Sequence, residues 1–496
     1  MEEISAFWSG VNETLQPFNE WLLEWSDHYW MYLLIPLLTL LSVYFSARLG
    51  LVQLRMIPEM CRTLFSQPET APDGKKAMSS YQAFSISAAA RIGTGNIVGV
   101  AGAIAVGGPG AVMWMWLMGL LVGATSFVES TLGQLYKVRE STGYRGGPAY
   151  YLERGLNARW AGIIFSITIV LTFAFVFNAV QSNTITGAMS SSVEQATGAE
   201  APLWLAPSVG VVLVALTALV IFGGVRRIAH VTQTLVPLMA LVYIVLGFVV
   251  VILFIDEVPG VLQLIFESAF GLREVAGATL GTVIVQGVRR GMFSNEAGLG
   301  SAPNAGASAS VSHPVKQGLV QTLGVYFDTL IVCSVTAFVI LVSNPTYGEE
   351  RGPVMTQEAL QTALGPWALH ALTVILLLVA FSSVLGNYYY GQANVRFITT
   401  RGGVLFGFQL VFLSATFLGT VVDVDIVWTL ADSTMGLMAL VNLLAIAPLT
   451  GMVALLLRDY KDQRRQGIEP VFTRDRLPYV RGTVECWEPR EERQLD

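Results

Sequence analysis

Charged residues are scarce in this sequence. Asp, Glu, Lys and Arg make up 13% of its 496 residues, against roughly 25% in a typical soluble protein. So few charges cannot cover the surface of a soluble multidomain enzyme, and they also exclude a disordered chain and a nucleic-acid-binding protein. Apolar residues are abundant instead, at 53%, and 48 residues are glycine. The composition therefore predicts a membrane protein, in which a dozen spans of about 20 residues would use roughly half the chain.

Catalytic and metal-binding motifs are also missing. The three cysteines, Cys61, Cys333 and Cys486, form no CxxC pair and are interpreted as packing residues or unbridged thiols. The four histidines are isolated, and the sequence contains no HExxH, Walker loop or GxSxG. These absences argue against an enzyme and against ATP-driven transport, so that uphill transport would need an ion gradient. A signal peptide is not expected either, because no Lys or Arg precedes Arg48.

Eleven apolar stretches are long enough to cross a membrane. They cover residues 29–49, 81–106, 110–136, 160–187, 203–222, 231–255, 275–301, 318–343, 367–398, 403–421 and 427–457. The segment 1–28 is expected to lie outside the bilayer. Apolar residues recur there at helical spacing from Leu15 to Tyr29, which favours an interfacial helix. The alternative is a polar leader. An extra first span with its loop (29–80), a transporter core (81–457) and a tail (458–496) would follow.

Basic residues predict the orientation of the spans. Of the 29 Lys and Arg residues, 24 fall in loops on one side or in the tail, two (Arg273 and Arg351) fall on the other side, and three lie within spans. Cytoplasmic loops carry the excess of Lys and Arg. The sequence therefore predicts a multi-pass protein of the plasma (inner) membrane with its N-terminus outside and its C-terminus in the cytoplasm. This arrangement requires an odd number of spans.

Two of the eleven spans are interrupted by glycine and polar residues. The stretch 81–106 contains the run GTGN at 93–96, and the stretch 275–301 contains the run SNEAG at 294–298. Polar groups are costly in hydrocarbon, and irregular backbone at that depth is tolerated where it lines a protein or water-filled cavity. Both stretches are therefore candidates for broken helices.

The spacing of the interrupted spans indicates an inverted repeat. They are the second and seventh spans, so a second unit of five spans (275–457) enters the membrane upside down relative to the first (81–255). Interrupted spans at matching positions of inverted halves indicate the central site of a secondary transporter. The alternative is close helix packing, which glycines such as Gly119 and Gly123 usually serve. Two polar, glycine-rich spans five apart favour the broken helices.

A broken helix offers two kinds of backbone group to a ligand. The N–H groups at the start of one half suit a carboxylate, and the C=O groups at the end of the other half suit sodium, which prefers oxygen ligands. Polar side chains at membrane depth could complete these sites or could form interhelical hydrogen bonds; they are Asn178, Gln181, Asn183, Asp328, Ser382, Ser383, Asn387, Trp428, Asp432 and Asn442.

Arg289 and Arg290 precede the second interruption, and the sequence leaves two explanations open for them. They extend toward water, or they pair with Glu296 or Glu129.

Four segments carry a family resemblance. They are GTGNIVGVA at 93–101 with GGPGA at 107–111, GGPAYYL at 146–152, FSNEAGLGSAP at 293–303, and WTLAD at 428–432. With these segments the chain resembles the alanine or glycine:cation symporter family, in the broad amino-acid–polyamine–cation superfamily. The resemblance implies an all-α membrane protein with a leucine-transporter-type five-plus-five inverted repeat and one extra N-terminal helix. It also implies sodium-coupled uptake of small amino acids, chiefly alanine and glycine.

The resemblance also assigns residues to two sites. The amino acid would contact both broken helices and two nearby side chains, at Thr94, Gly95, Asn96, Ser294, Asn295, Gly298, Gln181 and Trp428. The sodium ion would be bound by carbonyl and hydroxyl oxygens of Ala89, Ile92, Val379, Ser382 and Ser383. The two serines match the fold and not a family motif, and Ala149 stands where Met is common in the family.

Alternating access is the expected mechanism. Sodium orders the first broken helix, the amino acid binds, and one bundle of spans (the second, third, seventh and eighth) rocks against the rest. If Trp428 and Phe177 face one cavity, the pocket is small and accepts glycine and alanine alike, since one methylene is worth only about 1–3 kcal/mol. The proton is the alternative coupling ion, because Glu129, Glu296 and Asp328 could titrate at membrane depth.

Two rival classes remain open at the level of sequence. A channel could use the same polar spans without saturation or flux coupling. A membrane-embedded enzyme would need an acid pair, for which Glu296 with Glu129 is the one candidate.

Overall fold

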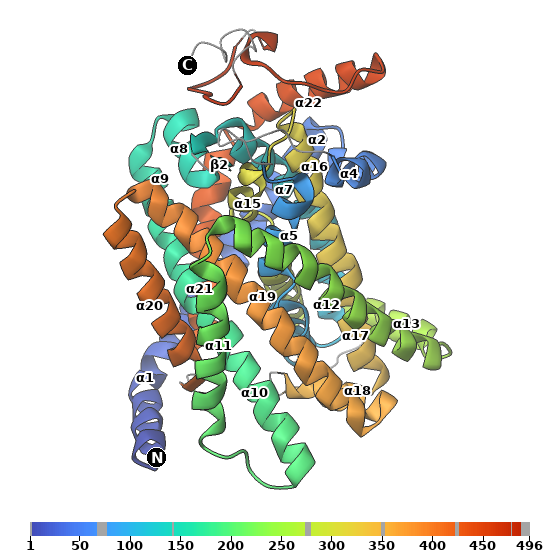
Figure 1. The fold of residues 1–496 in the computed structure, drawn as a ribbon. Coiled ribbons are helices and arrows are strands. Elements are labelled where there is room, and N and C mark those ends of the chain that lie inside the picture. The colour runs from blue at the N-terminus through green and yellow to red at the C-terminus, as the bar shows by residue number, and fades with distance from the viewer. Residues whose placement is uncertain are drawn as a thin grey trace.

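Helices build almost all of the protein. The computed structural model describes residues 2–66, 77–140, 143–272, 279–348, 353–421, 426–477 and 479–487. Within these ranges the only sheet is one antiparallel hairpin of β1 (Val138–Glu140) and β2 (Gly143–Arg145), in which Arg139 pairs with Tyr144. Long helices run between two ends of the molecule, and the end that carries α22 (Thr450–Arg465) is called the tail face below (Figure 1). The opposite end is called the far face.

Eight described helices are long and apolar enough to cross a membrane. They cover Glu13–Arg48, Gly110–Leu135, Arg159–Thr197, Val225–Leu253, Val315–Val342, Pro366–Ile398, Gly402–Val421 and Ile426–Ile446. A pair of helices bent by 59°, Ser80–Arg91 and Thr94–Gly107, forms a ninth crossing if it is counted as one span. Two more predicted spans correspond to shorter helices, α11 (Leu205–Ile221) and α14 (Leu280–Asn295). The fold is therefore that of a multi-pass membrane protein, whereas the count of eleven stays a prediction.

Three of these crossings contain a π-helical turn. The first joins α1 (Glu2–Tyr29), η1 (Trp30–Leu34) and α2 (Ile35–Arg48), so the segment predicted at 1–28 is helical and continuous with the first span. The others join α9 (Arg159–Ile169), η3 (Val170–Phe177) and α10 (Asn178–Thr197), and α16 (Val315–Tyr326), η4 (Phe327–Val332) and α17 (Cys333–Val342). Single π turns inside α-helices are frequent at functional sites.

The remaining helices complete the fold. They are α3 (Val52–Arg55), α4 (Ile57–Leu64), α5 (Ser80–Arg91), η2 (Thr94–Asn96), α6 (Val98–Gly107), α7 (Gly110–Leu135), α8 (Pro148–Leu156), α12 (Val225–Leu253), α13 (Val258–Ala269), α15 (Ala302–Ser308), α18 (Val354–Leu364), α19 (Pro366–Ile398), α20 (Gly402–Val421), α21 (Ile426–Ile446) and η5 (Arg474–Arg476). Local sequence sets several of their ends. Ser79 and Gln82 form a reciprocal capping box at the start of α5, and Pro148 and Pro366 occupy first helical positions, where proline is tolerated.

The long helices pack into two groups. In the first group, α7 packs against α14, α15 and α16, and α6 packs against α14 and α17. In the second group, α19 packs against α9 and α10, and α20 packs against α10 and α11. Helix α12 contacts both groups, and α21 lies against α9 and η3 of the second. The first group holds the interrupted span 275–301 and the second half of the interrupted span 81–106, whereas α5, the first half of that span, packs against α12 and α19 as well as α15.

Small residues let helices of the first group approach closely. A Cβ atom on Gly119 would lie 2.9 Å from Thr329 Cγ2, and one on Gly123 would lie 2.9 Å from the Tyr326 hydroxyl. This is the packing role that the GxxxG pattern predicts.

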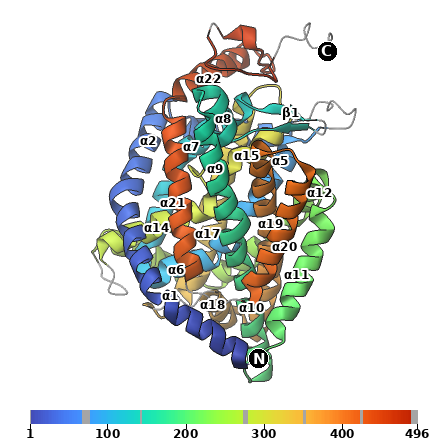
Figure 2. The same cartoon turned by 90° about the vertical axis from the view of Figure 1, so that its left-hand side faces the viewer.

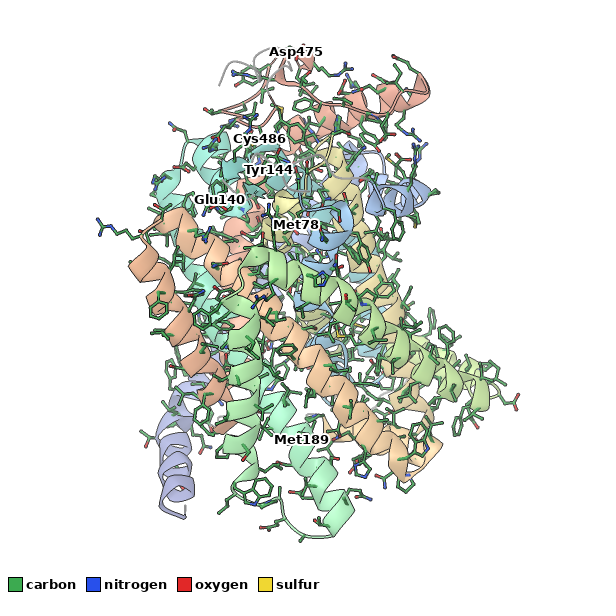
Figure 3. The ribbon with its side chains drawn as sticks, viewed as in Figure 1. Met78, Glu140, Tyr144, Met189, Asp475 and Cys486 are labelled. Carbon is green, nitrogen blue, oxygen red and sulfur yellow. The ribbon has the colours of Figure 1, made fainter. Side chains whose placement is uncertain are left out.

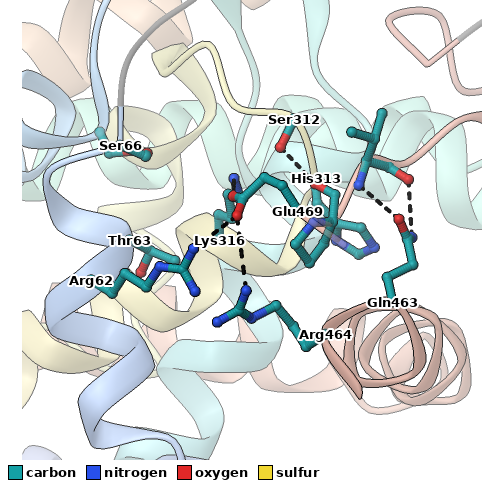
Figure 4. A network of polar contacts seen from close by, with 12 residues as sticks. Arg62, Thr63, Ser66, Ser312, His313, Lys316, Gln463, Arg464 and Glu469 are labelled. Atoms are coloured by element: carbon teal, nitrogen blue, oxygen red, sulfur yellow. Dashed lines mark hydrogen bonds and ion pairs between the residues drawn. The ribbon is translucent and has the colours of Figure 1, made fainter. Parts of the chain in front are cut away.

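The tail face is covered by the chain that follows α22. Glu469 lies between Lys316, Arg62 and Arg464 (Figure 4). The Phe472 N–H donates to the carbonyl of Ser312. Further along, the indole of Trp487 donates to carbonyls at the end of α7. The C-terminal segment is therefore docked on the ends of α4, α7 and α16.

Candidate functional site

The first break is a change of helix direction made by residues 92–97. α5 ends at Arg91, and η2 forms a single 3-10 turn before α6 begins at Val98. The Asn96 Oδ1 atom accepts a hydrogen bond from the Gly93 N–H at 3.0 Å, which closes the turn. The Thr94 N–H donates to Gln181 Oε1 at 3.3 Å, so α10 reaches the break. The Thr94 hydroxyl is buried without a hydrogen-bond partner in the described chain, and it is therefore available to a ligand.

The second break stops α14 at Asn295. Glu296, Gly298 and Gly300 have φ angles of +56°, +86° and +77°. This left-handed backbone cannot continue a right-handed helix, and glycine adopts it without steric cost. α15 starts at Ala302. Both interrupted spans are thus broken in the structure, as the sequence predicts.

Glu129 of α7 holds the second break in shape. This buried carboxylate accepts hydrogen bonds from the N–H groups of Gly298 (3.3 Å) and Gly300 (3.1 Å) and from Asn442 Nδ2 (2.7 Å). The hydroxyl of Tyr151 donates in turn to the Asn442 side chain. These contacts connect α7, α8 and α21 to the break.

Gly298 belongs to the Glu129 cluster and not to the contact between the two breaks. A Cβ atom on it would lie 3.2 Å from Leu38 Cδ1 and 3.5 Å from Thr125 Cγ2, on α2 and α7. Gly298 therefore contacts α2, α7 and α21 at the Glu129 cluster, and its place in a substrate site stays a prediction. Glu296 accepts a hydrogen bond from the Ser301 hydroxyl at 2.6 Å, within the same break.

The two breaks meet at Gly95. A Cβ atom there would lie 2.6 Å from Phe293 Cδ1 and 3.6 Å from the Cα of Ser294. Asp328, in the π turn η4, joins the breaks from the other side: it accepts hydrogen bonds from Asn96 Nδ2 (2.6 Å) and from the Ser294 hydroxyl (2.5 Å). One buried carboxylate thus ties both breaks together.

Two residues flank this junction. Asn295 donates to the Thr329 hydroxyl at 3.0 Å and accepts from the Ala297 N–H, so its side chain supports the turn. The Cys333 thiol lies 3.1 Å from the Ser294 hydroxyl and 3.4 Å from Asn96 Nδ2. None of the three cysteines forms a disulfide.

The predicted sodium ligands lie where α19 crosses the end of α5. The hydroxyls of Ser382 and Ser383 are 2.8 and 3.1 Å from the carbonyl oxygen of Val379, to which they donate. Ser383 faces the first break, because its hydroxyl oxygen is 2.6 Å from the Cβ position of Gly93. Ser382 faces α12, where its hydroxyl is 3.5 Å from Met239 Sδ.

The last turn of α5 completes this set. Ala89 lies there and Ile92 caps it, and Gly386 of α19 packs so closely that a Cβ atom on it would lie 2.8 Å from Ala90 Cβ. A hydroxyl that donates to a carbonyl keeps its own lone pairs, so these oxygens suit a cation. The described residues contain no group of three or more His, Cys, Asp or Glu that could hold a metal ion.

Aromatic rings pack beside the junction of the breaks. Phe293 lies between Phe177 and Trp428, with ring centroids 4.6 and 5.4 Å away. Trp428 therefore contacts Phe293, and Phe293 in turn lies against Gly95 at the junction of the breaks. Phe177 ends the π turn η3, and Trp428 lies in the first turn of α21.

Arg289 and Arg290 lie next to these rings and pair with Asp432. Arg290 donates to both carboxylate oxygens of Asp432 at 3.1 Å, and its guanidinium is 5.2 Å from the Trp428 ring centroid. Arg289 reaches Asp432 at 3.3 Å and Asp27 at 2.6 Å. Both explanations from the sequence are wrong: the arginines are buried, and their partners are Asp432 and Asp27 instead of Glu296 or Glu129. Glu129 and Glu296 instead accept hydrogen bonds from residues of the second break.

A cavity of about 700 Å³ opens on the tail side. The β1–β2 hairpin, the starts of α5 and α12 and the end of α19 line it, and no residue of either break is among its lining. Figure 3 shows Met78, Glu140 and Tyr144 at this level, beneath the tail face. This cavity therefore lies between the breaks and the tail face, and it is separate from the ring and ion-pair contacts around Phe293 and Asp432.

The structure therefore gathers most of the predicted substrate residues. Thr94, Gly95, Asn96, Gln181 and Ser294 surround the junction of the breaks, with Trp428 one ring away. The assignment by sequence did not include Phe293, Asp328 or the partner of the arginines. Asp328 stands out in the sequence as a lone acid in an apolar span. Its position beside Asn96, however, depends on how the helices pack.

Comparisons with known proteins agree with these features. The family model described as "Sodium:alanine symporter family" matches residues 15–474. The chain is 47% identical to "Probable sodium/glutamine symporter GlnT" of Bacillus subtilis (strain 168), over 93% of this chain and 94% of that protein. It is 40% identical to "Putative sodium/proton-dependent alanine carrier protein YrbD" of the same strain, over 89% and 92%. It is 35% identical to "Sodium/alanine symporter AgcS" of Methanococcus maripaludis, over 88% and 95%.

Proposed function

The chain belongs to the sodium:alanine symporter family, and we propose that it imports a small neutral amino acid, alanine or glycine, together with sodium. As a member of a transporter family it is not an enzyme. The proposed mechanism is alternating access on a leucine-transporter-type inverted repeat of eleven spans.

The unpartnered hydroxyl of Thr94 carries the proposal for the substrate. It is buried at the junction of the breaks, beside Gln181 and the start of α6. A helix start offers N–H groups without intrahelical partners, which suit a carboxylate. In this proposal the carboxylate of the amino acid binds at Thr94, Gly95 and Asn96, and the amine binds near Ser294 and Gln181.

Close packing supports a small substrate. Phe293 is in ring contact with both Phe177 and Trp428 at the junction, and Gly95 has no room for a methyl group. A site of this kind excludes a large side chain by contact, whereas a single methylene changes the binding free energy by only about 1–3 kcal/mol. Glycine and alanine are therefore the proposed substrates.

Sodium is proposed to bind between α5 and α19. The candidate ligands are the hydroxyls of Ser382 and Ser383 and the carbonyl oxygens of Ala89, Ile92 and Val379. Ser383 is adjacent to Gly93, so an ion bound there would fix the end of α5 next to the substrate turn. That contact would supply the coupling, because each ligand then stabilises the backbone conformation that the other needs.

The tail face is proposed to lie in the cytoplasm. The basic loops and the docked C-terminal segment gather there, as the excess of Lys and Arg on cytoplasmic loops predicts. The cavity beneath this face would then be the exit route. The rings and the arginine–aspartate pairs would form the closed extracellular side.

Uptake into liposomes tests the proposal. The purified protein should accumulate labelled alanine with an inward sodium gradient and not with a potassium gradient of equal size. Thr94→Val keeps the shape but removes the hydroxyl, and we expect at least about a tenfold loss of uptake, because a hydrogen bond to a charged group is worth about 1.5–3 kcal/mol. Thr168→Val, on a partly exposed position of α9, is the matched control and should transport normally.

Competition experiments test the size of the pocket. Glycine should compete with labelled alanine, and leucine should not. Glutamine belongs in the series, because a relative is named a probable sodium/glutamine symporter. If leucine competes as well as glycine does, the small-pocket proposal is wrong.

A proton is the second candidate for the coupling ion. The buried carboxylate of Asp328 joins both breaks, so its protonation would change the contact between them. One relative is named a putative sodium/proton-dependent alanine carrier. Alanine uptake driven by a pH gradient in sodium-free buffer would favour the proton, and its loss in Asp328→Asn would assign it to this residue.

A further inference from the structure

The N-terminal helix is fastened to both helical groups. Where α1 meets η1, the Tyr29 hydroxyl donates to the carbonyl of Gly436 (3.2 Å), and the Trp30 indole donates to the carbonyl of Asp432 (3.1 Å), both on α21. Further along, the hydroxyls of Ser42 on α2 and Thr125 on α7 are 2.7 Å apart. The attachment changes from α21 to α7 across the π turn η1, as the course of α1 and α2 in Figure 2 illustrates.

The same helix completes a buried charge cluster. Arg289, Arg290 and Asp432 are almost fully buried, with 1%, 6% and 4% of their side chains exposed. Two guanidinium groups on one carboxylate would leave a net positive charge at membrane depth, which is costly. Asp27 of α1, whose side chain is half exposed, accepts a hydrogen bond from Arg289 at 2.6 Å and so balances the cluster from its solvent-facing edge.

Trp30 holds Arg289 from a second direction. Its ring is fully buried, and the Arg289 guanidinium lies 5.5 Å from the ring centroid. The indole N–H meanwhile fixes the backbone of Asp432. A single residue thus contacts both partners of the ion pair, one through its ring and one through its N–H.

We propose that the N-terminal helix is a latch on the far side of the site, in which Asp27 and Trp30 are positioning residues for Arg289 and Asp432. The inference rests on the proposed alternating access. For the far side to open, α14 of the first group must separate from α21 of the second, and Arg289 and Arg290 bridge these helices. The latch adds a third helix to the bridge and stabilises the closed state relative to the open one.

Thiol accessibility tests the latch without requiring transport. Cys333 is buried beside Asn96 and Ser294. In a Cys61→Ser, Cys486→Ser background, a membrane-impermeant thiol reagent applied from the far side should reach it only when that side opens. We expect Asp27→Asn to raise the modification rate by about tenfold, within the range typical of coupling between sites. Trp30→Phe should also raise it, because it keeps a ring but loses the N–H.

Two variants serve as controls. Asp27→Glu keeps the carboxylate and should restore a rate within about twofold of the parent, and Glu24→Gln removes an exposed charge three residues away on the same helix and should change nothing. In liposomes, Asp27→Asn should also lower the alanine concentration that half-saturates uptake from the far side. A larger open fraction raises the apparent affinity there.

The outcomes separate the latch from the transport proposal. If folded, monodisperse Asp27→Asn protein has the same Cys333 rate as Glu24→Gln, the latch is refuted, whatever the uptake result. If the rate rises but the parent shows no sodium-driven uptake, the latch stands and the proposed function fails. A fall in thermal stability with no change in Cys333 rate would make Asp27 and Trp30 merely structural and would also refute the proposal.

Discussion

Replacing Glu129 with glutamine tests how the second break is held. The carboxylate is fully buried and accepts three hydrogen bonds, two of them from the N–H groups of Gly298 and Gly300. Glutamine has nearly the same shape but only one acceptor oxygen. Whichever way the amide turns, its NH₂ group faces at least one N–H donor, and that donor loses its partner in a buried site.

The magnitude follows from these contacts. A buried donor without a partner costs about 1–3 kcal/mol, and bonds to a neutral amide are roughly half as strong as bonds to a carboxylate. Removing the buried charge offsets part of this loss. We therefore expect Glu129→Gln to lower the free energy of unfolding by about 2–4 kcal/mol and to abolish sodium-driven uptake, because the break cannot keep its left-handed turn.

A double-mutant cycle with Asn442→Ala isolates the contact. Unfolding would be followed by tryptophan fluorescence in detergent for the parent, both single variants and the double variant. The two residues share the cluster, so the expected coupling energy is at least about 1 kcal/mol. Ser126→Ala removes a buried hydroxyl on the same helix that has no hydrogen-bond partner among the described residues, and this control should be nearly neutral.

Two results would refute the reasoning about Glu129. Strict additivity of Glu129→Gln and Asn442→Ala would mean that the residues do not act together. A stability loss below about 0.5 kcal/mol, with normal uptake, would mean that the carboxylate does not hold the break.

Three further predictions concern the first break, the sodium ligands and the docked C-terminal segment. Asn96→Ala should abolish uptake while the protein stays folded, because Asn96 closes the first break and contacts Asp328; normal uptake would remove Asn96 from the site. Ser383→Ala should raise the half-saturating sodium concentration by about tenfold or more without changing the order of competing amino acids, and Ser382→Ala should have the smaller effect because Ser382 faces α12. An equal effect of both would contradict this orientation. Docking of the C-terminal segment should weaken as the pH falls from 7 to 5, because burial lowers the pKa of His313 below its ordinary 6.5, and only the undocked histidine then gains a proton. Asp459 should not contribute in this range, since burial acts to raise its pKa but hydrogen bonds from His313 and Arg476 outweigh that and hold the pKa at about 2. Hydrogen exchange of residues 471–477 should follow this pH dependence in the parent and lose it in His313→Gln.

Local sequence predicted the breaks more reliably than it predicted their partners. Glycine-rich runs at 93–96 and 294–298 stand out in apolar spans, and helices break where the backbone needs left-handed residues or where a polar side chain replaces a helical bond. The partner of Arg289 and Arg290 was misassigned, because Glu296 is near in sequence whereas Asp432 is 142 residues from Arg290. Sequence distance carries no information about which helices of a bundle are neighbours.

The sequence by itself determined the class of the protein and the places of its two helix breaks. Scarce charge, long apolar runs and basic residues gathered in alternate loops are properties of the chain alone, because the bilayer selects them residue by residue. Only the tertiary structure decided that Asp328 joins the two breaks, that Gly298 belongs with Glu129, and that Asp27 of the N-terminal helix balances Arg289. Each of these contacts forms between helices far apart in the chain. A buried charge is stabilised by whichever partner the packing brings within hydrogen-bond distance.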